Sequence, residues 1–376
     1  MSMLILPRAT LRLRLGAFAL LMAVGLHSNM GRAEGSSAPA QPENAPQPLN
    51  VIVPTTSFSP ARVKTFGPLE YPVAAVRSSQ EGWAVVSTMV DGNGKPYETA
   101  IMRSTRNAAL DKAAVTALEH STFEPATSDG RPTESAVEVK YRFLLDSPEG
   151  SASSAFVSAY EKFNNAMRGD GKMEAQAALR LLDGVNLYED AFLGIAEYRY
   201  AFKYGTQSDQ IAGLERAISD EKAPKYLPRA EFEDALRRFL ILEVQTNHFQ
   251  EAITAWEKLQ QSSTDKKTLA ALKPVMDQVN SLRTDPRPYA ITGELTPSVS
   301  ADGAPEGTWF LDLFKPRFRI EVKEGSLAEI KLRCDKKFLS FPFDPELEYH
   351  VESHFGQCEM QLLGAPGSRF TVIQSG

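Results

Sequence analysis

The sequence of 376 residues predicts a multidomain α+β protein with three folded parts. Two changes in hydrophobic periodicity support this prediction. Up to Pro148 apolar and polar residues alternate in strand-like runs, and beyond it apolar residues recur three and four positions apart, as in helices. Past Pro286 and Pro288 short strand-like runs return. We therefore expect a ββαβ module, a helical region and an antiparallel β module, in that order.

The ββαβ module is predicted to open with a β-hairpin. An apolar run over residues 82–90 ends at Asp91-Gly92-Asn93-Gly94, and a second extended run follows. Glycine and asparagine tolerate positive φ angles, so this turn joins two antiparallel strands. A helix is predicted next, because apolar residues share one helical face. These residues are Leu110, Ala113, Ala114, Ala117 and Leu118. We expect the helix to lie on the hairpin.

The last predicted strand of this module covers residues 137–143, where apolar and charged residues alternate. Its apolar members are Val137, Val139, Tyr141 and Phe143, and its charged members are Glu138, Lys140 and Arg142. The alternation predicts one face that packs on the helix and one face that meets water. The strand can lie at a sheet edge, where unpaired backbone groups are available to a partner peptide.

The same residues resemble the C-terminal domain of the TonB family over residues 68–146. The motifs occur in the family's order, which makes the resemblance specific. They are Tyr71-Pro72, the Val-rich strand from Gly82 to Asp91-Gly92, Leu110-Asp111-Lys112-Ala113-Ala114, Phe123-Glu124-Pro125-Ala126 and the alternating strand at residues 137–143. The resemblance implies a periplasmic module that captures a peptide segment of a partner protein. It points to the last strand as the binding edge, with Tyr71 and Pro72 as further candidate binding residues. The alternative is that the fold serves only as a packing or dimerising unit.

The amino end is predicted to be a secretory signal peptide over residues 1–33. Arginines precede an apolar run of 12 residues, and Gly31-Arg32-Ala33 offers small residues for cleavage. As a helix the run would span roughly 18 Å, less than the ~30 Å hydrocarbon core of a membrane. Loss of the four arginines of this region takes the formal charge from −6 to −10. An acidic chain argues against nucleic acid or an anionic membrane as the main partner, and no stable membrane insertion is expected after cleavage of the signal peptide.

Residues 34–60 are predicted to be an extended linker, because they are rich in proline, alanine and glutamine. The ββαβ module then covers residues 61–147. Residues 150–284 form the helical region, in which helix pairs recur and resemble degenerate tetratricopeptide repeats, so an α-helical solenoid is predicted. An aromatic stripe of this region is assigned to its core. It comprises Phe156, Tyr160, Phe192, Tyr198 and Phe202.

Residues 286–376 are predicted to form a small antiparallel sandwich or barrel, because short strand-like runs are separated by turn residues. The only cysteines, Cys334 and Cys358, both lie here. In an exported chain a lone pair most simply forms a disulfide bond. No CxxC spacing favours a metal or redox role. His350 and His354 lie four residues apart in a strand-like run, too far apart for one metal ion.

No catalytic motif was found, and no cofactor or metal is expected. The combined features predict an exported periplasmic adaptor that binds other envelope proteins or their peptide segments, such as an outer-membrane protein, and assists envelope transport. One alternative is a true TonB-type energy transducer with an uncleaved membrane anchor. The other is an accessory subunit of a cell-envelope enzyme.

Overall fold

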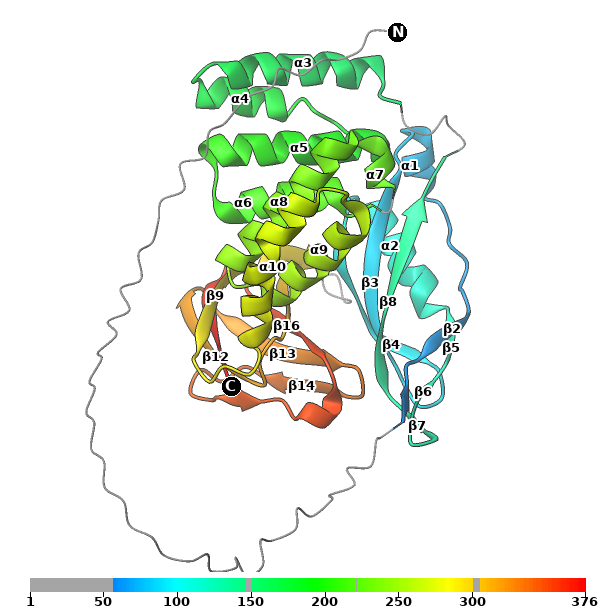
Figure 1. Ribbon diagram of the computed structural model, residues 1–376. Coiled ribbons are helices and arrows are strands. Elements are labelled where there is room, and N and C mark those ends of the chain that lie inside the picture. The colour runs from blue at the N-terminus through cyan, green and yellow to red at the C-terminus, as the bar shows by residue number, and fades with distance from the viewer. Residues whose placement is uncertain (1–56, 146–150, 221, 300–304) are drawn as a thin grey trace, which may run out of the picture. The chain divides into compact units, whose positions relative to one another are not determined.

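The computed structural model describes residues 57–145, 151–220, 222–299 and 305–376 (Figure 1). These residues belong to one compact unit. The predicted signal peptide and nearly all of the predicted linker lie outside the described residues. Within the described part of the chain, no helix is both long and apolar enough to cross a membrane.

The amino-terminal part contains an antiparallel sheet in the order β4-β3-β8, with α2 across one face. The predicted order of strand, strand, helix and strand is therefore found. Asn107 starts α2, because its side chain accepts hydrogen bonds from the amides of Ala109 and Leu110. The bounds are β3 Gly82–Val90, β4 Pro96–Ser104, α2 Ala108–Glu119 and β8 Ser135–Phe143.

Several short elements around this sheet were not predicted. Phe58 and Ser59, which fall within the predicted linker, form β1, and β1 pairs with β6. The turn at Asp129-Gly130 joins β6 to β7, and both of its residues have positive φ angles. The remaining bounds are β2 Arg62–Thr65, α1 Val73–Arg77, β5 Thr122–Glu124, β6 Ala126–Ser128 and β7 Arg131–Thr133.

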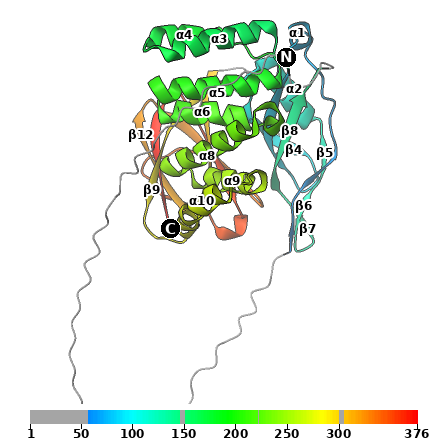
Figure 2. The same ribbon diagram turned by 45° about the horizontal axis from the view of Figure 1, so that its top comes forward.

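The middle part is helical, as predicted. Glycines allow close approach of α5 and α6: a Cβ on Gly194 would lie 2.5 Å from the backbone nitrogen of Ala217, and one on Gly213 would lie 2.5 Å from that of Tyr198. Figure 2 shows α3 and α4 beside α5. The helices are α3 Ser154–Arg168, α4 Lys172–Leu179, α5 Leu187–Tyr204, α6 Gln207–Ile218, α7 Ala223–Tyr226, α8 Arg229–Gln245, α9 Phe249–Ser262 and α10 Lys266–Ser281. The tetratricopeptide-like solenoid stays a prediction.

The aromatic stripe is only partly in the core. Phe156 and Tyr198 are buried, and Tyr160 and Phe192 are half-buried against core clusters. Phe202 is 60% exposed, so its assignment to the core was wrong. It lies in the last turn of α5, where its ring centre is 6.0 Å from that of Tyr198 and most of its side chain meets water.

The carboxy-terminal part consists of two antiparallel sheets, in the orders β10-β11-β16-β13-β14 and β15-β12-β17-β9. Side chains from both sheets form one core, so this part is a sandwich. Cys334 and Cys358 face each other on β13 and β16 and form the predicted disulfide bond. The bounds are β9 Tyr289–Glu294, β10 Thr296–Val299, β11 Pro305–Asp312, β12 Arg317–Glu324, β13 Leu327–Cys334, β14 Phe338–Pro342, β15 Tyr349–His350, β16 Cys358–Gly364 and β17 Arg369–Ser375.

Candidate peptide-binding edge

Strand β8 lies at the edge of its sheet. It pairs with β3 over residues 135–143, and no other described strand pairs with it. The carbonyl of Trp83 accepts a hydrogen bond from the amide of Thr105, so the Trp83 backbone points toward β4. In an antiparallel pair, a residue opposite such a position turns its own N–H and C=O away from the shared strand. Arg142 lies opposite Trp83, and therefore Arg142, Lys140 and Glu138 direct their backbone groups to the open edge.

The apolar face of β8 packs as predicted. Tyr141 and Phe143 are buried in the core beneath α2, and Val137 and Val139 are half-buried against the same core. This face therefore holds the strand in place and is not available to a partner.

The charged face of β8 differs from the prediction, because the helical region covers most of it. Lys140 Nζ donates a hydrogen bond to the Ser219 carbonyl at 2.6 Å and lies 4.7 Å from the centre of the Trp83 ring. Arg142 contacts both carboxylate oxygens of Asp220 at 3.1 Å. Glu138 alone among the three charged side chains is exposed. The expectation that this face meets water holds for Glu138 and fails for Arg142.

The sequence of β3 indicates that the helical region covers this face of the sheet. Apolar residues occupy both faces of that strand: Ala84 and Val86 pack under α2, whereas Trp83 and Val85 pack with the helical region. A strand that is apolar on both faces indicates a sheet covered on both sides. The prediction that one face of this sheet meets water did not take the apolar residues on both faces of β3 into account.

Tyr71 and Pro72 lie beside the end of β8. The Tyr71 ring contacts the Phe143 ring edge to face at 5.5 Å, and its hydroxyl donates to the Gln80 carbonyl at 2.6 Å. Burial, with a smaller contribution from the charge of Glu81, raises the pKa of Tyr71 to about 12. Pro72 precedes the first residue of α1. The contacts of Tyr71 therefore anchor the segment that flanks the edge strand.

Exposed apolar side chains near this end of β8 were not predicted as part of the site. Phe66 is 61% exposed, and its ring contacts Tyr141 of β8. Val73 and Val76 of α1 and Leu144 after β8 are also exposed. They come from separate short segments and α1 has only five residues, so no run was long enough for periodicity to identify them.

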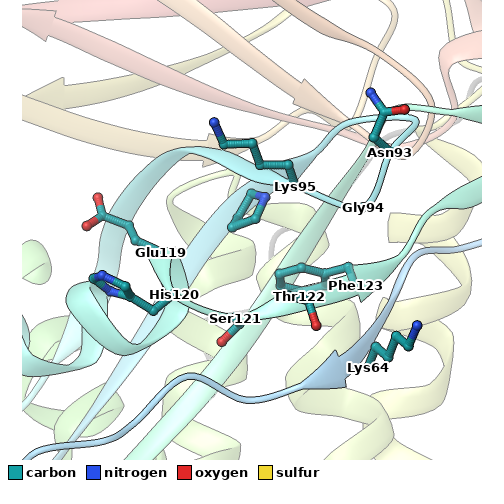
Figure 3. Close-up of a pocket in the computed structure, with 10 residues that line it drawn as sticks. Lys64, Asn93, Gly94, Lys95, Glu119, His120, Ser121, Thr122 and Phe123 are labelled. Atoms are coloured by element: carbon teal, nitrogen blue, oxygen red, sulfur yellow. The ribbon is translucent and has the colours of Figure 1, made fainter.

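A pocket of about 500 Å³ lies elsewhere on this part of the chain (Figure 3). The β3–β4 turn, the end of α2, β2 and β5 supply its lining. The lining residues are Lys64, Asn93, Gly94, Lys95, Pro96, Glu119, His120, Ser121, Thr122 and Phe123. None of the predicted binding residues is among them. Among the described residues, no group of three or more His, Cys, Asp or Glu residues is suited to hold a metal ion. His350 and His354 therefore belong to no such group.

An antiparallel sheet with a helix on one face and an unpaired edge strand defines a small αβ module of the kind that can accept another strand. Residues 67–145 match the family model for the Gram-negative bacterial TonB protein C-terminal region and form a TonB C-terminal domain. This range agrees with the resemblance over residues 68–146. The family match does not extend to the helical region or the sandwich.

Individual TonB proteins are similar to a limited part of this chain. The chain is 32% identical over 83 residues to protein TonB of Xanthomonas campestris pv. campestris strain B100, which covers 22% of this chain and 37% of that protein. It is 34% identical over 77 residues to protein tonB2 of Pseudomonas aeruginosa, covering 20% and 28%. The chain thus spans well under half the length of these relatives. The solution NMR structure of the Pseudomonas aeruginosa TonB C-terminal domain is 20% identical, with a TM-score of 0.22, over 24% of this chain and 92% of that one.

Proposed function

We propose that this protein is a periplasmic adaptor whose TonB domain binds an extended segment of an outer-membrane protein as an additional strand along β8. The observation that carries this proposal is the open edge of β8, where alternate backbone groups are turned away from β3. TonB C-terminal domains interact with outer-membrane receptors, which supports a partner of this class. Main-chain hydrogen bonds would supply affinity, and side chains along the edge would supply specificity.

Specificity is assigned mainly to Glu138 and to the exposed apolar residues near the end of β8. Lys140 and Arg142 already contact Ser219 and Asp220, so a partner would have to compete with those interactions. Glu138 keeps an exposed carboxylate on a residue whose backbone also faces the edge. A partner strand with a cationic or hydrogen-bonding group opposite Glu138 fits this arrangement.

The test is a substitution that removes one edge N–H while sparing the side-chain contacts with the helical region. Proline is tolerated on an edge strand where its missing N–H would face outward, and its preceding residue prefers an extended backbone, as Val137 has in β8. We expect Glu138→Pro to fold normally and to lose binding. The matched control Glu138→Ala keeps the N–H and loses only the carboxylate, so it should retain binding with altered affinity.

Binding is measured by incubating the immobilised full-length protein with detergent-solubilised outer-membrane proteins from its native cells and identifying those retained. Circular dichroism and thermal unfolding of each variant verify its fold. Retention of the same outer-membrane proteins by unmodified protein, Glu138→Ala and Glu138→Pro alike would refute strand addition at β8.

A further inference from the structure

Two carboxyl groups face each other on the sandwich sheet that lies toward the TonB domain. Asp312 on β11 and Glu359 on β16 are direct register partners, so their side chains share one face of the sheet. Opposed cross-strand residues have Cβ atoms about 5 Å apart, and like charges at this separation repel. Glu359 is 8% exposed, which strengthens the repulsion between the charged forms.

A third carboxyl group, Glu251 on α9, faces the same region. Its Oε2 atom is fully enclosed and has no hydrogen-bond partner, although it interacts electrostatically with Asp312 and Glu243. An enclosed carboxylate oxygen without a donor is costly in the charged form. A proton on Glu251 lowers that cost, because a neutral carboxyl group is less costly to bury than a carboxylate.

The other charged groups around these carboxyls come from every part of the chain. The TonB sheet supplies Arg103 and Glu138, the helical region supplies Glu215, Glu243 and His248, and the sandwich supplies Arg333. Arg103 also forms an ion pair with Glu215, in which a guanidinium nitrogen lies 3.4 Å from a carboxylate oxygen. The Arg333 guanidinium is directed to the Glu98 carbonyl and to Gln361, each at 2.7 Å. The available positive charge is therefore already divided among several acceptors.

Burial is the main cause of raised pKa values at all three carboxyls, and neighbouring negative charge adds to it. The pKa of Glu251 is raised to about 8, that of Asp312 to about 6, and that of Glu359 well above its ordinary value. The folded chain thus binds more protons here than the unfolded chain. The resulting stability is present at low pH and is lost as pH rises through these values. Asp312 keeps access to water, so Glu251 and Glu359 contribute most.

We propose that Glu251, Asp312 and Glu359 form a proton-dependent latch at the junction of the TonB domain, the helical region and the sandwich. With protons bound, the three parts are held together. Once the protons are lost, repulsion among the carboxylates loosens the junction. This role goes beyond partner binding and needs no partner, so it stands or falls independently of strand addition at β8.

Trp83 provides a probe of the junction, because it is 2% exposed and packs between the TonB sheet and the helical region. In a chain carrying Trp256→Phe and Trp309→Phe, acrylamide quenching reports on Trp83 alone. Between about pH 5 and pH 9 we expect quenching to increase and the unfolding temperature to fall by about 5 °C. Glu251→Gln and Glu359→Gln each mimic one protonated carboxyl, so each should reduce both changes with pH, and the two together should remove most of them.

Asp277→Asn is the matched control, because Asp277 is an exposed carboxylate of α10 paired with Lys273. It should follow the pH slope of the parent chain. A parent chain whose quenching and unfolding temperature do not change over this range would overturn the latch, as would glutamine variants that keep the parent slope. If the double phenylalanine chain does not fold, thermal unfolding of the natural chain with Asp312→Asn, Glu251→Gln or Glu359→Gln decides the matter by the same criteria.

Discussion

Arg142 illustrates how a residue on an edge strand can act inside the protein. Its guanidinium engages both oxygens of Asp220, and the two side chains are only 18% and 5% exposed. Removing charges from water costs several kcal/mol per ion, and only good geometry with further hydrogen bonds repays it. Asp220 meets this condition, because it also accepts a hydrogen bond from the Lys222 amide at 2.8 Å. The pair therefore joins β8 to the segment between α6 and α7.

Loss of Arg142 should destabilise the chain much more than loss of an exposed arginine. Arg142→Ala leaves the Asp220 carboxylate buried without its partner, and we expect a loss of about 3 kcal/mol in the free energy of unfolding. Arg142→Ala combined with Asp220→Ala should recover part of that loss, which a double-mutant cycle in urea measures.

Arg319 serves as the control, because its pair with Glu321 is exposed at 50% and 38%. Arg319→Ala should cost less than about 1 kcal/mol. Equal costs for Arg142→Ala and Arg319→Ala would contradict a stabilising role of the buried pair.

Among the elements, those with strong local patterns could be predicted from the sequence. The turn at Asp91-Gly92-Asn93-Gly94 and the helix from Ala108 can each be recognised from a short stretch of sequence. The short strand β1 could not be predicted in this way, because it exists only through pairing with β6, far along the chain. The edge position of β8 was likewise predictable from the alternation and the resemblance. The partners of Lys140 and Arg142 were not, since Ser219 and Asp220 come from a distant segment without a distinctive pattern.

The disulfide between β13 and β16 should stabilise the sandwich. It closes a loop with a sequence separation of 24, which restricts the unfolded chain and is worth about 3 kcal/mol on the loop-entropy model. Replacing both cysteines, Cys334→Ser with Cys358→Ser, should lower the free energy of unfolding by about this amount, as measured in urea.

Reduction of the natural protein with dithiothreitol provides the matched comparison, because it breaks the bond without changing the composition of the buried core. The reduced protein and the double serine variant should lose similar amounts of the free energy of unfolding. The variant should be somewhat less stable than the reduced protein, because serine places hydroxyl groups where Cys334 and Cys358 are buried. An oxidised protein no more stable than the reduced one would show that the bond does not stabilise this fold.

At the scale of the whole molecule, the three parts share cores. The cluster centred on the helical region also contains Trp83 from the TonB sheet and Phe314 from the sandwich. Glu98 of β4 forms a salt bridge with Lys331 of β13, in which the Lys331 Nζ atom lies 2.8 Å from a carboxylate oxygen of Glu98. Each part has a self-consistent hydrophobic pattern in the sequence, so three separate modules were a natural expectation. The contacts instead indicate that the helical region and the sandwich cover the TonB sheet on the face opposite α2.

The TonB domain should therefore behave differently when isolated. Residues 57–145 alone would expose Trp83, Val85 and Met89, which lie on the face opposite α2 and are buried or half-buried in the full chain. A contiguous exposed apolar surface promotes association. We expect the isolated domain to bind an apolar fluorescent dye and to self-associate, as shown by size-exclusion chromatography with light scattering. The full-length chain provides the reference.

Substitution of Trp83 separates this explanation from a general loss of folding. In the isolated domain, Trp83→Thr removes the largest exposed apolar side chain and retains a residue that favours strands, so it should reduce dye binding and association. In the full-length chain the same change removes a core side chain and should cost about 3 kcal/mol or more. The same substitution should thus make the isolated domain less prone to associate and make the full-length chain less stable. An isolated domain that is monomeric, binds no dye and matches the full chain in thermal stability would show that the covering of this sheet face contributes nothing to the fold.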